Sequence, residues 1–335
     1  MRIHRRAASG PPSVCRLLAS RRIPGAAAGL LVALTVFGAL APAPLLSATE
    51  PKPPIIDVHL HAFPADFMGQ PGAPNPLTGK PSEAITDDDL LRAALAAMNR
   101  YNIVKAIVSG PIVSVRRWVA AAPDRLVGAA MFPNPPPSPD LGLLRDDLRN
   151  HELGALGEVT AQYAGISPSD ASLEPYMALA EEMDVPIGIH TGSGPPGAVY
   201  ECCPKFRESV GNPLLLEELL VRHPKLRVFI MHAGYPYFDD TVALLHAYPQ
   251  VYADVAVIDW VLPRSEFHDY LRRLVQAGFG KRLMFGSDQM VWPEAIGMAV
   301  EGIESARFLT PAQKRDIFYN NAARFLRMDR SPPPR

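Results

Sequence analysis

Short apolar runs alternate with helical patterns along the chain from about residue 53 onward. Most of the runs are continuous stretches of Val, Ile, Leu and Ala, as expected for parallel strands that are buried on both faces. The intervening segments place apolar residues at helical spacing; in 87–101, for example, Leu90, Leu91, Ala94 and Met98 share one stripe. Eight runs are predicted to be strands: 55–59, 103–109, 126–132, 155–159, 186–190, 227–232, 251–255 and 282–286.

This alternation, with short joins, predicts an α/β fold. Right-handed βα units build either a closed barrel or a doubly wound sheet, and eight strands favour the (β/α)8 TIM barrel. No Gly-rich dinucleotide-binding or P-loop pattern follows any of the runs, which argues against a nucleotide-binding sheet. We predict one barrel domain over residues 53–328. Helices are predicted at 87–101, 113–122, 141–151, 173–183, 213–222, 239–248, 265–277, 294–304 and 310–326.

Two segments have a composition that predicts no regular structure. Residues 63–84 form a Pro- and Gly-rich connection directly after the first strand. Connections of this length in a compact domain are usually functional lids or disordered. The tail 329–335, Asp-Arg-Ser-Pro-Pro-Pro-Arg, is predicted to be disordered.

The first 48 residues differ from the rest of the chain. They contain six Arg and no acidic residue, and an apolar run from about 25 to 46 follows the arginines. Residues 39–41 (Ala-Leu-Ala) fit a small-x-small cleavage pattern, and residues 46–48 (Leu-Ser-Ala) fit it less well. This arrangement predicts a secretory signal peptide over residues 1–48, which takes no part in the fold.

The route of export stays open between two signals. Ser20-Arg21-Arg22 resembles a twin-arginine signal, but Pro24 and Gly25 follow where bulky apolar residues are usual. The apolar run is also about long enough for an N-terminal membrane anchor, although its prolines favour cleavage. Both readings place the barrel outside the cytoplasm, in the periplasm or secreted, because the arginines stay on the cytoplasmic side.

Charge and cysteine usage limit the partners. Six of the 33 basic residues and none of the 34 acidic residues lie in 1–48, so the remaining chain has a net charge of −7. No Lys/Arg-rich run remains there, so nucleic acid and anionic membrane surfaces are not expected partners, while a homo-oligomer stays open. Cys202 and Cys203 are adjacent, a spacing that strains a mutual bond, so we predict free thiols or an intermolecular bridge.

Two histidines end the first predicted strand. His59 and His61 lie two residues apart in Ile-Ile-Asp-Val-His-Leu-His, so their side chains point to the same side, about 7 Å apart along the strand. At the mouth of a barrel both imidazoles reach one metal ion. Asp57, one step deeper on the same side, is predicted to orient a ligand histidine. The alternative is a pair of buried structural histidines.

Four more residues end later strands. His190 closes Pro-Ile-Gly-Ile and His232 closes Val-Phe-Ile-Met, while Asp288 follows the eighth strand in Phe-Gly-Ser-Asp. Glu158, in Gly-Glu-Val at the end of the fourth strand, is either an ion-pair partner or a ligand that bridges two metals. In a closed barrel all of them converge with the first strand on one face. Imidazoles and carboxylates are ligands for zinc and similar ions.

These segments resemble the amidohydrolase superfamily, specifically its amidohydrolase-2 branch of TIM-barrel metal-dependent hydrolases and decarboxylases. The resemblance covers the motifs from about residue 55 to residue 288, in the family's order. It implies that a divalent metal is held by His59, His61, His190 and Asp288, with Glu158 as a further candidate. Zinc is the first choice and manganese the second. Binuclear members often have a carboxylated Lys on the fourth strand, which this chain lacks, so one ion or two stays open.

The expected chemistry follows from that metal. A bound divalent ion lowers the pKa of its water from about 15.7 toward about 7. Asp288 then takes the proton as water attacks a carbonyl and later passes it to the leaving group. His232, which matches an acid/base in mononuclear members, polarises the carbonyl. The predicted function is hydrolysis of an ester, lactone or amide bond of a small molecule.

The substrate is less well determined. Tyr235 follows His232 and Trp292 follows Asp288, which predicts an aromatic mouth that contacts the substrate, with core or lid packing as the alternative. No Arg nearer than Arg207 follows the metal-binding motifs, which favours a neutral substrate over a carboxylate. Two alternatives remain: a metal-dependent decarboxylase of the same branch, and a non-catalytic barrel that binds a ligand.

Overall fold

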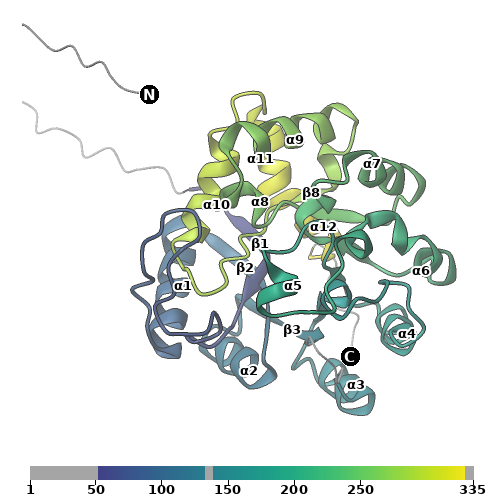
Figure 1. The fold of residues 1–335 in the computed structure, drawn as a ribbon, viewed down its shortest axis with the longest axis horizontal. Helices are drawn as coiled ribbons and strands as arrows, with labels where there is room; N and C mark the ends of the chain where they lie inside the picture. The colour runs from purple at the N-terminus through teal and green to yellow at the C-terminus, as the bar shows by residue number, and fades with distance from the viewer. Residues whose placement is uncertain (1–51, 133–138, 329–335) are drawn as a thin grey trace, which may run out of the picture. The chain divides into compact units, whose positions relative to one another are not determined.

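The computed structural model describes residues 52–132 and 139–328, so the predicted signal peptide (1–48) and tail (329–335) lie outside the described residues. Eight parallel strands are paired in chain order, β1 to β8, in one sheet. This is the predicted barrel architecture, and helices surround the strands (Figure 1). The strands are β1 Ile55–His61, β2 Ile103–Gly110, β3 Leu126–Phe132, β4 Ala155–Val159, β5 Ile187–Ile189, β6 Val228–Ile230, β7 Tyr252–Asp254 and β8 Leu283–Met284.

The barrel is nearly closed between the last and first strands. No ladder joins β8 to β1 among the described residues, but two backbone hydrogen bonds do. The Val58 amide donates to Phe285 O at 3.0 Å, and the Asp288 amide donates to His59 O at 2.7 Å. The second bond brings Asp288 beside the strand that carries His59 and His61, as the barrel prediction requires.

The helices occupy the predicted intervals, with ends shifted by a few residues. The Thr86 side chain accepts a hydrogen bond from Asp89 N at the start of α1, and Thr310 begins α11 with a full capping box involving Gln313. The predicted last helix contains a π-helical turn at Asp316–Asn320. The α-helices are α1 Asp87–Tyr101, α2 Ile112–Ala121, α3 Leu141–Arg149, α4 Glu174–Glu182, α5 Ala198–Glu201, α6 Glu217–Arg222, α7 Phe238–Ala247, α8 Ile258–Val261, α9 Arg264–Gln276, α10 Ala295–Glu304, α11 Pro311–Arg315 and α12 Asn321–Phe325.

Two apolar layers pack on the strands. The larger layer joins outward-facing strand residues such as Val108 and Leu156 to the helices. The smaller layer combines residues from β1, β2, β3, β4, β6 and β8 with Phe325 of α12. Ile107 belongs to the inner layer and its neighbour Val108 to the outer one, which is the side-chain alternation of a strand. A filled interior leaves one end of the barrel for chemistry.

The long connection after β1 is held in place at its centre. The Trp292 indole N–H donates to Ala73 O at 2.8 Å, and the Ser82 hydroxyl donates to Val291 O at 3.0 Å. Asn75 is fully buried in the same connection. These contacts fix residues 63–84 against the segment that follows β8, although this connection contains no helix and no named strand.

The prediction for the two cysteines is wrong: Cys202 and Cys203 form a disulfide with each other, directly after α5. Sequence spacing alone argued against this bond because adjacent residues give a strained ring.

Among the described residues, no helix has the length and apolar character needed to cross a membrane.

Candidate metal centre

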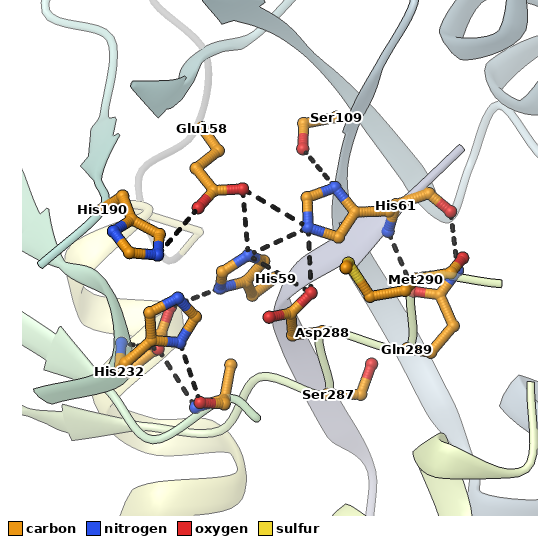
Figure 2. A network of polar contacts seen from close by, with 12 residues as sticks. His59, His61, Ser109, Glu158, His190, His232, Ser287, Asp288, Gln289 and Met290 are labelled. Atoms are coloured by element: carbon orange, nitrogen blue, oxygen red, sulfur yellow. Dashed lines mark hydrogen bonds and ion pairs between the residues drawn. The ribbon is translucent and has the colours of Figure 1, made fainter. Parts of the chain in front are cut away.

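Six buried side chains meet at the end of the barrel where the parallel strands finish (Figure 2). His59 and His61 are the last residues of β1 on that face, and His190 and His232 follow β5 and β6 directly or within two residues. Glu158 comes from β4, and Asp288 follows β8. The structure thus brings together all six residues that the sequence singled out.

The imidazole nitrogens gather around one carboxylate. The Nε2 atoms of His59, His61 and His190 lie 3.8, 3.5 and 3.9 Å from an oxygen of Glu158. Asp288 Oδ1 lies 3.0 Å from His61 Nε2. The His232 ring lies 4.8 Å from the His190 ring between centroids, and one nitrogen of each is within 4.8 Å of a Glu158 oxygen. Glu158 therefore lies at the centre of the cluster.

The opposite nitrogen, Nδ1, of each histidine is held by a neighbouring element. The acceptor is a carboxylate for His59, an amide oxygen for His190 and a backbone carbonyl for His232, so Nδ1 of these three rings carries a proton. His61 Nδ1 meets a hydroxyl instead. The contacts are His59 to Asp254 Oδ2 (3.0 Å), His61 to Ser109 Oγ (2.9 Å), His190 to Gln162 Oε1 (2.8 Å) and His232 to Ala256 O (2.9 Å).

Asp57 does not have the predicted role of orienting a histidine ring. Its Oδ1 accepts the backbone amides of His59 and Ser287, at 3.0 and 3.1 Å, and so ties β1 to the segment that carries Asp288. Burial raises the Asp57 pKa to about 6 despite these hydrogen bonds. The orienting carboxylate is Asp254, at the end of β7, which also accepts the His232 amide through Oδ1 at 2.9 Å.

Backbone strain is concentrated at the same end of the barrel. His232 and Ala233 have φ values of 59° and 47°, and Asp288 has a φ of 44°. These are left-handed conformations that side chains other than glycine adopt at a cost of about 1–3 kcal/mol each. Such strain is commonly found at functional sites, where the surrounding structure maintains it.

The charges of the cluster favour a cation. Burial lowers the pKa of His59, but the negative charges of Asp288 and Asp254 raise it well above its usual value. Burial raises the pKa of Glu158, yet the hydrogen bond with His59 and the charge of His190 lower it to about 2. Burial and the neighbouring His232 lower the pKa of His190 to about 4, so this imidazole is neutral at pH 7 and keeps a lone pair.

The donor set fits a divalent metal. His59 Nε2 and His61 Nε2 lie 3.1 Å apart, so both nitrogens are close enough to bind the same ion. Asp288 Oδ1 is buried and has no hydrogen-bond donor in the described part of the chain. Several imidazoles with two carboxylates form a ligand set typical of zinc and related ions. The groups that can share an ion include His59, His61 and Glu158.

A cavity of about 1150 Å³ opens onto the cluster and is lined by Glu158, His190, His232 and Asp288. Neither predicted substrate-contacting residue lines it. Trp292 is buried in the core and faces Trp260, and the Tyr235 hydroxyl is 3.3 Å from Glu266 on the outer side. Both follow site residues in sequence, but of the residues just after His232 and Asp288 it is Met290 that lines the cavity.

Tyr163 lines the cavity and was not singled out from the sequence. Tyr163 follows β4, and its hydroxyl lies 3.4 Å from His190 Nε2. Burial, with the charges of Glu158 and Asp288, raises the Tyr163 pKa well above 10. The phenol is therefore neutral at working pH and can donate a hydrogen bond. A signal was present, because Tyr163 follows the Gly-Glu-Val motif by a few residues.

Comparison with known proteins agrees with this geometry. A family model described as amidohydrolase matches residues 56–328, which is most of the chain. The chain belongs to the amidohydrolase family. Members of this family depend on metal ions and include hydrolases and decarboxylases, and the cluster described above is one that could bind such an ion.

Individual relatives of this amidohydrolase are distant. Protein fluG of Emericella nidulans is 22% identical over 163 residues, which are 44% of this chain and 18% of that longer protein. A probable 2-pyrone-4,6-dicarboxylic acid hydrolase from Acinetobacter baumannii has a TM-score of 0.58 at 14% identity, over 81% of this chain and 98% of that one. A 2,6-dihydroxybenzoate decarboxylase from Rhizobium has a TM-score of 0.57 at 16% identity, over 83% and 99%. These likenesses show the fold.

A buried carboxyl close to the candidate metal centre offers a stability test. Asp259 in α8 is fully buried, and neither carboxyl oxygen has a hydrogen-bond partner among the described residues. Burial, with the charges of Asp57 and Asp254, raises its pKa well above 3.8. The folded protein therefore holds a proton that the unfolded chain releases above about pH 4, so folding costs up to about 1.4 kcal/mol per pH unit as pH rises toward the folded pKa.

We expect Asp259→Asn to remove this cost. The variant should unfold at a higher temperature than the parent, and the difference should grow between pH 5 and pH 8, by about 2–4 °C for each kcal/mol. Thermal unfolding of the metal-loaded proteins at the two pH values measures this. Asp269→Asn, on the exposed side of α9, is the control. A difference that does not grow with pH would contradict the assignment of a protonated Asp259.

Proposed function

We propose that this amidohydrolase is a metal-dependent hydrolase that activates water to cleave an ester, lactone or amide bond of a small molecule. One observation supports the proposal most. Three Nε2 atoms lie within 3.9 Å of Glu158 oxygens, on rings whose Nδ1 atoms are already held, and Glu158 and His190 line a cavity large enough for a small molecule. Histidines with a purely structural role would not require three Nε2 atoms that converge on one carboxylate.

His59, His61, His190, Glu158 and Asp288 are the residues that would hold the metal, with zinc the first choice and manganese the second. The group supplies Lewis-acid activation of water and of a carbonyl oxygen when bound. The protein's contribution is orientation. Asp254, Ser109 and Gln162 fix the rings of His59, His61 and His190, so that their free nitrogens face one point without rearrangement.

Asp288 is proposed to move the proton. Its carboxylate faces the cavity, and its pKa lies below the usual range, since the charges of His59 and His61 outweigh the effect of burial. It is therefore ionised at pH 7 and can accept a proton from the attacking water, then pass it to the leaving oxygen or nitrogen. The strained backbone at Asp288, together with the bond from its amide to His59 O, keeps the carboxylate in place.

Two further side chains are proposed to act on the substrate carbonyl. His232 donates its Nδ1 proton to Ala256 O, so its Nε2 must gain a proton before it can donate to the carbonyl oxygen. The neutral Tyr163 hydroxyl has a proton available at any working pH. A donor aimed at the developing oxyanion is typically worth about 10²–10³ in rate.

We also propose that the protein is exported to the periplasm or secreted. The Arg-rich, acid-free start and the apolar run after it support this proposal. The Cys202–Cys203 disulfide is compatible with it, because disulfides persist in oxidising compartments.

A substrate panel tests the proposed reaction. Aryl esters, lactones, amides, and aromatic or unsaturated carboxylic acids are incubated with metal-loaded and chelated protein. We expect acid release from at least one ester, lactone or amide by the loaded protein, and a return to background after chelation. Carbon dioxide release from an acid, with no hydrolysis, would make the protein a decarboxylase. Stoichiometric metal with no turnover would leave only a ligand-binding barrel.

A further inference from the structure

We propose that the substrate of this site is an uncharged molecule with an aromatic or other apolar group, and that the cavity selects against carboxylates. The inference rests on the proposed function and names the substrate class. Two features of the cavity carry it: an aromatic column that runs outward from His61, and the absence of an available cation among the described lining residues.

The aromatic column begins at a metal-centre residue. The His61 and Phe63 rings are stacked with centroids 4.3 Å apart and planes 11° from parallel. Phe67 stacks on Phe63 in turn, at 3.7 Å and 5°. Phe63 is buried, whereas Phe67 and its neighbour Met68 are 43% and 41% exposed and line the cavity. The column thus offers an apolar surface that leads from the metal centre to the opening.

Hydrogen bonds hold the connection that carries the aromatic column in place. The connection that carries it is tied to the segment after β8 through Trp292 and Ser82. Contiguous exposed apolar surface is typical of ligand-binding grooves. Further apolar side chains line the cavity from other elements, namely Ile112, Met131, Leu143, Leu144 and Met290. An aromatic or acyl group of a substrate would be covered on several sides.

The charges of the cavity walls are mostly negative. Arg116 is the single Lys or Arg among the described lining residues, and its guanidinium is already paired with Asp147 at 2.8 Å and Glu152 at 3.2 Å. Asp140 and Glu201 add negative charge away from the metal centre.

A carboxylate on the part of the substrate that lies against these walls, away from the metal centre, would therefore lose water without gaining a free cation, and would face several carboxylates. An uncharged group meets neither cost. The cavity consequently discriminates by repulsion as well as by apolar contact, the two means by which sites achieve specificity.

A matched pair of aryl esters tests the inference. 4-Acetoxyacetophenone and 4-acetoxybenzoate differ in one group, a neutral acetyl against a carboxylate, and both release a phenol that is measured by absorbance. We expect metal-loaded protein to give a kcat/KM at least ~10-fold higher for the neutral ester, which corresponds to ~1.4 kcal/mol. An equal or higher value for the anionic ester would overturn the proposal.

Freeing the paired arginine should reduce this preference. In the double variant Asp147→Asn, Glu152→Gln, Arg116 keeps its charge and loses both partners, so it becomes available to a carboxylate. We expect the neutral-to-anionic ratio of kcat/KM to fall by ~10-fold. Asp146→Asn makes one of the same charge changes on α3 at an exposed position outside the cavity lining, and should leave the ratio unchanged. A ratio unaffected by the double variant would count against repulsion by these walls.

The aromatic column has its own variant. Phe67→Ala should raise the KM for the neutral ester by ~10-fold with little change in kcat, because the lost contact serves binding and not the reacting atoms. Leu77→Ala removes another exposed apolar side chain of the same connection, outside the cavity lining, and should leave both constants unchanged. A Phe67 variant with wild-type KM would refute the proposed contact between the column and the substrate.

Binding of non-reacting ligands separates this inference from the proposed reaction. 4-Methoxyacetophenone and 4-methoxybenzoate contain no bond that a hydrolase of this kind cleaves. Titration calorimetry on metal-loaded protein should show the ketone binding at least ~10-fold more tightly. Equal or tighter binding of the benzoate overturns the substrate class even if hydrolysis is observed. Preference for the ketone with no turnover of any ester, lactone or amide supports the class and refutes the reaction.

Discussion

Asp288→Asn is expected to lower kcat by about 10²–10⁴-fold while the protein still folds and, at saturating metal, still binds the ion. The amide keeps one oxygen at the position of Oδ1, 3.0 Å from His61 Nε2, but it cannot accept the proton of the attacking water. The loss should appear in kcat rather than KM, because the carboxylate is required for the proton transfer and not for holding the substrate.

The measurement needs a control for charge and one for metal content. Asp239→Asn makes the same chemical change on a side chain that is 96% exposed, in α7, and should keep wild-type rates. Metal analysis of each protein shows whether any loss comes from an empty centre. Retention of more than a tenth of the wild-type kcat by metal-loaded Asp288→Asn would refute the proton-transfer role of Asp288.

Much of the barrel could be predicted from the sequence because parallel strands buried on both faces are uniformly apolar. The eight runs correspond to the eight strands, but four strands are much shorter than their runs. The run predicted at 227–232 contains a strand only at Val228–Ile230. His232 and Ala233 turn into left-handed backbone immediately afterward, so the ladder ends while the chain is still apolar. Apolar character reports burial, and it does not show where ladder hydrogen bonds stop.

The histidines of the site could be predicted for a related reason. Each of them interrupts an apolar run at a strand end, and barrel topology brings strand ends together. Their partners could not be predicted in the same way, because the partner comes from another strand in three dimensions. Asp254 illustrates this: it reaches His59 Nδ1 from β7, 195 residues along the chain. Asp57 is nearer in sequence and points to the correct end, yet its carboxylate accepts backbone amides.

Sequence proximity also misled the prediction of substrate contacts. Trp292 lies four residues after Asp288, but its indole N–H is bonded to Ala73 O, so the ring packs in the core. The cavity wall comes instead from Phe63 and Phe67 after β1 and from Tyr163 after β4. Phe63 and Phe67 lie in a loop and Tyr163 in a short 3-10 helix, Ala161–Ala164. The direction of a side chain in such short segments depends on tertiary hydrogen bonds that a one-dimensional pattern does not contain.

His59→Ala is expected to lose the metal, with less than a tenth of the wild-type metal content after purification. Its Nε2 is 3.1 Å from His61 Nε2 and 3.8 Å from Glu158, so its removal opens the centre of the donor set. Metal analysis and titration of the chelated protein with zinc measure the effect. His246→Ala, an exposed histidine of α7, is the matched control and should bind as the parent does.

Asp254→Asn distinguishes the contribution of the His59 imidazole to metal affinity from the contribution of its orientation by Asp254. It leaves the His59 imidazole in place but replaces the carboxylate that fixes Nδ1 at 3.0 Å. Loss of such an orienting partner typically costs about 10–100-fold in metal affinity, so the order of zinc affinity should be parent, then Asp254→Asn, then His59→Ala. If His59→Ala kept stoichiometric zinc with parental affinity, the imidazoles would be structural, and the proposed hydrolysis would have no metal centre to support it.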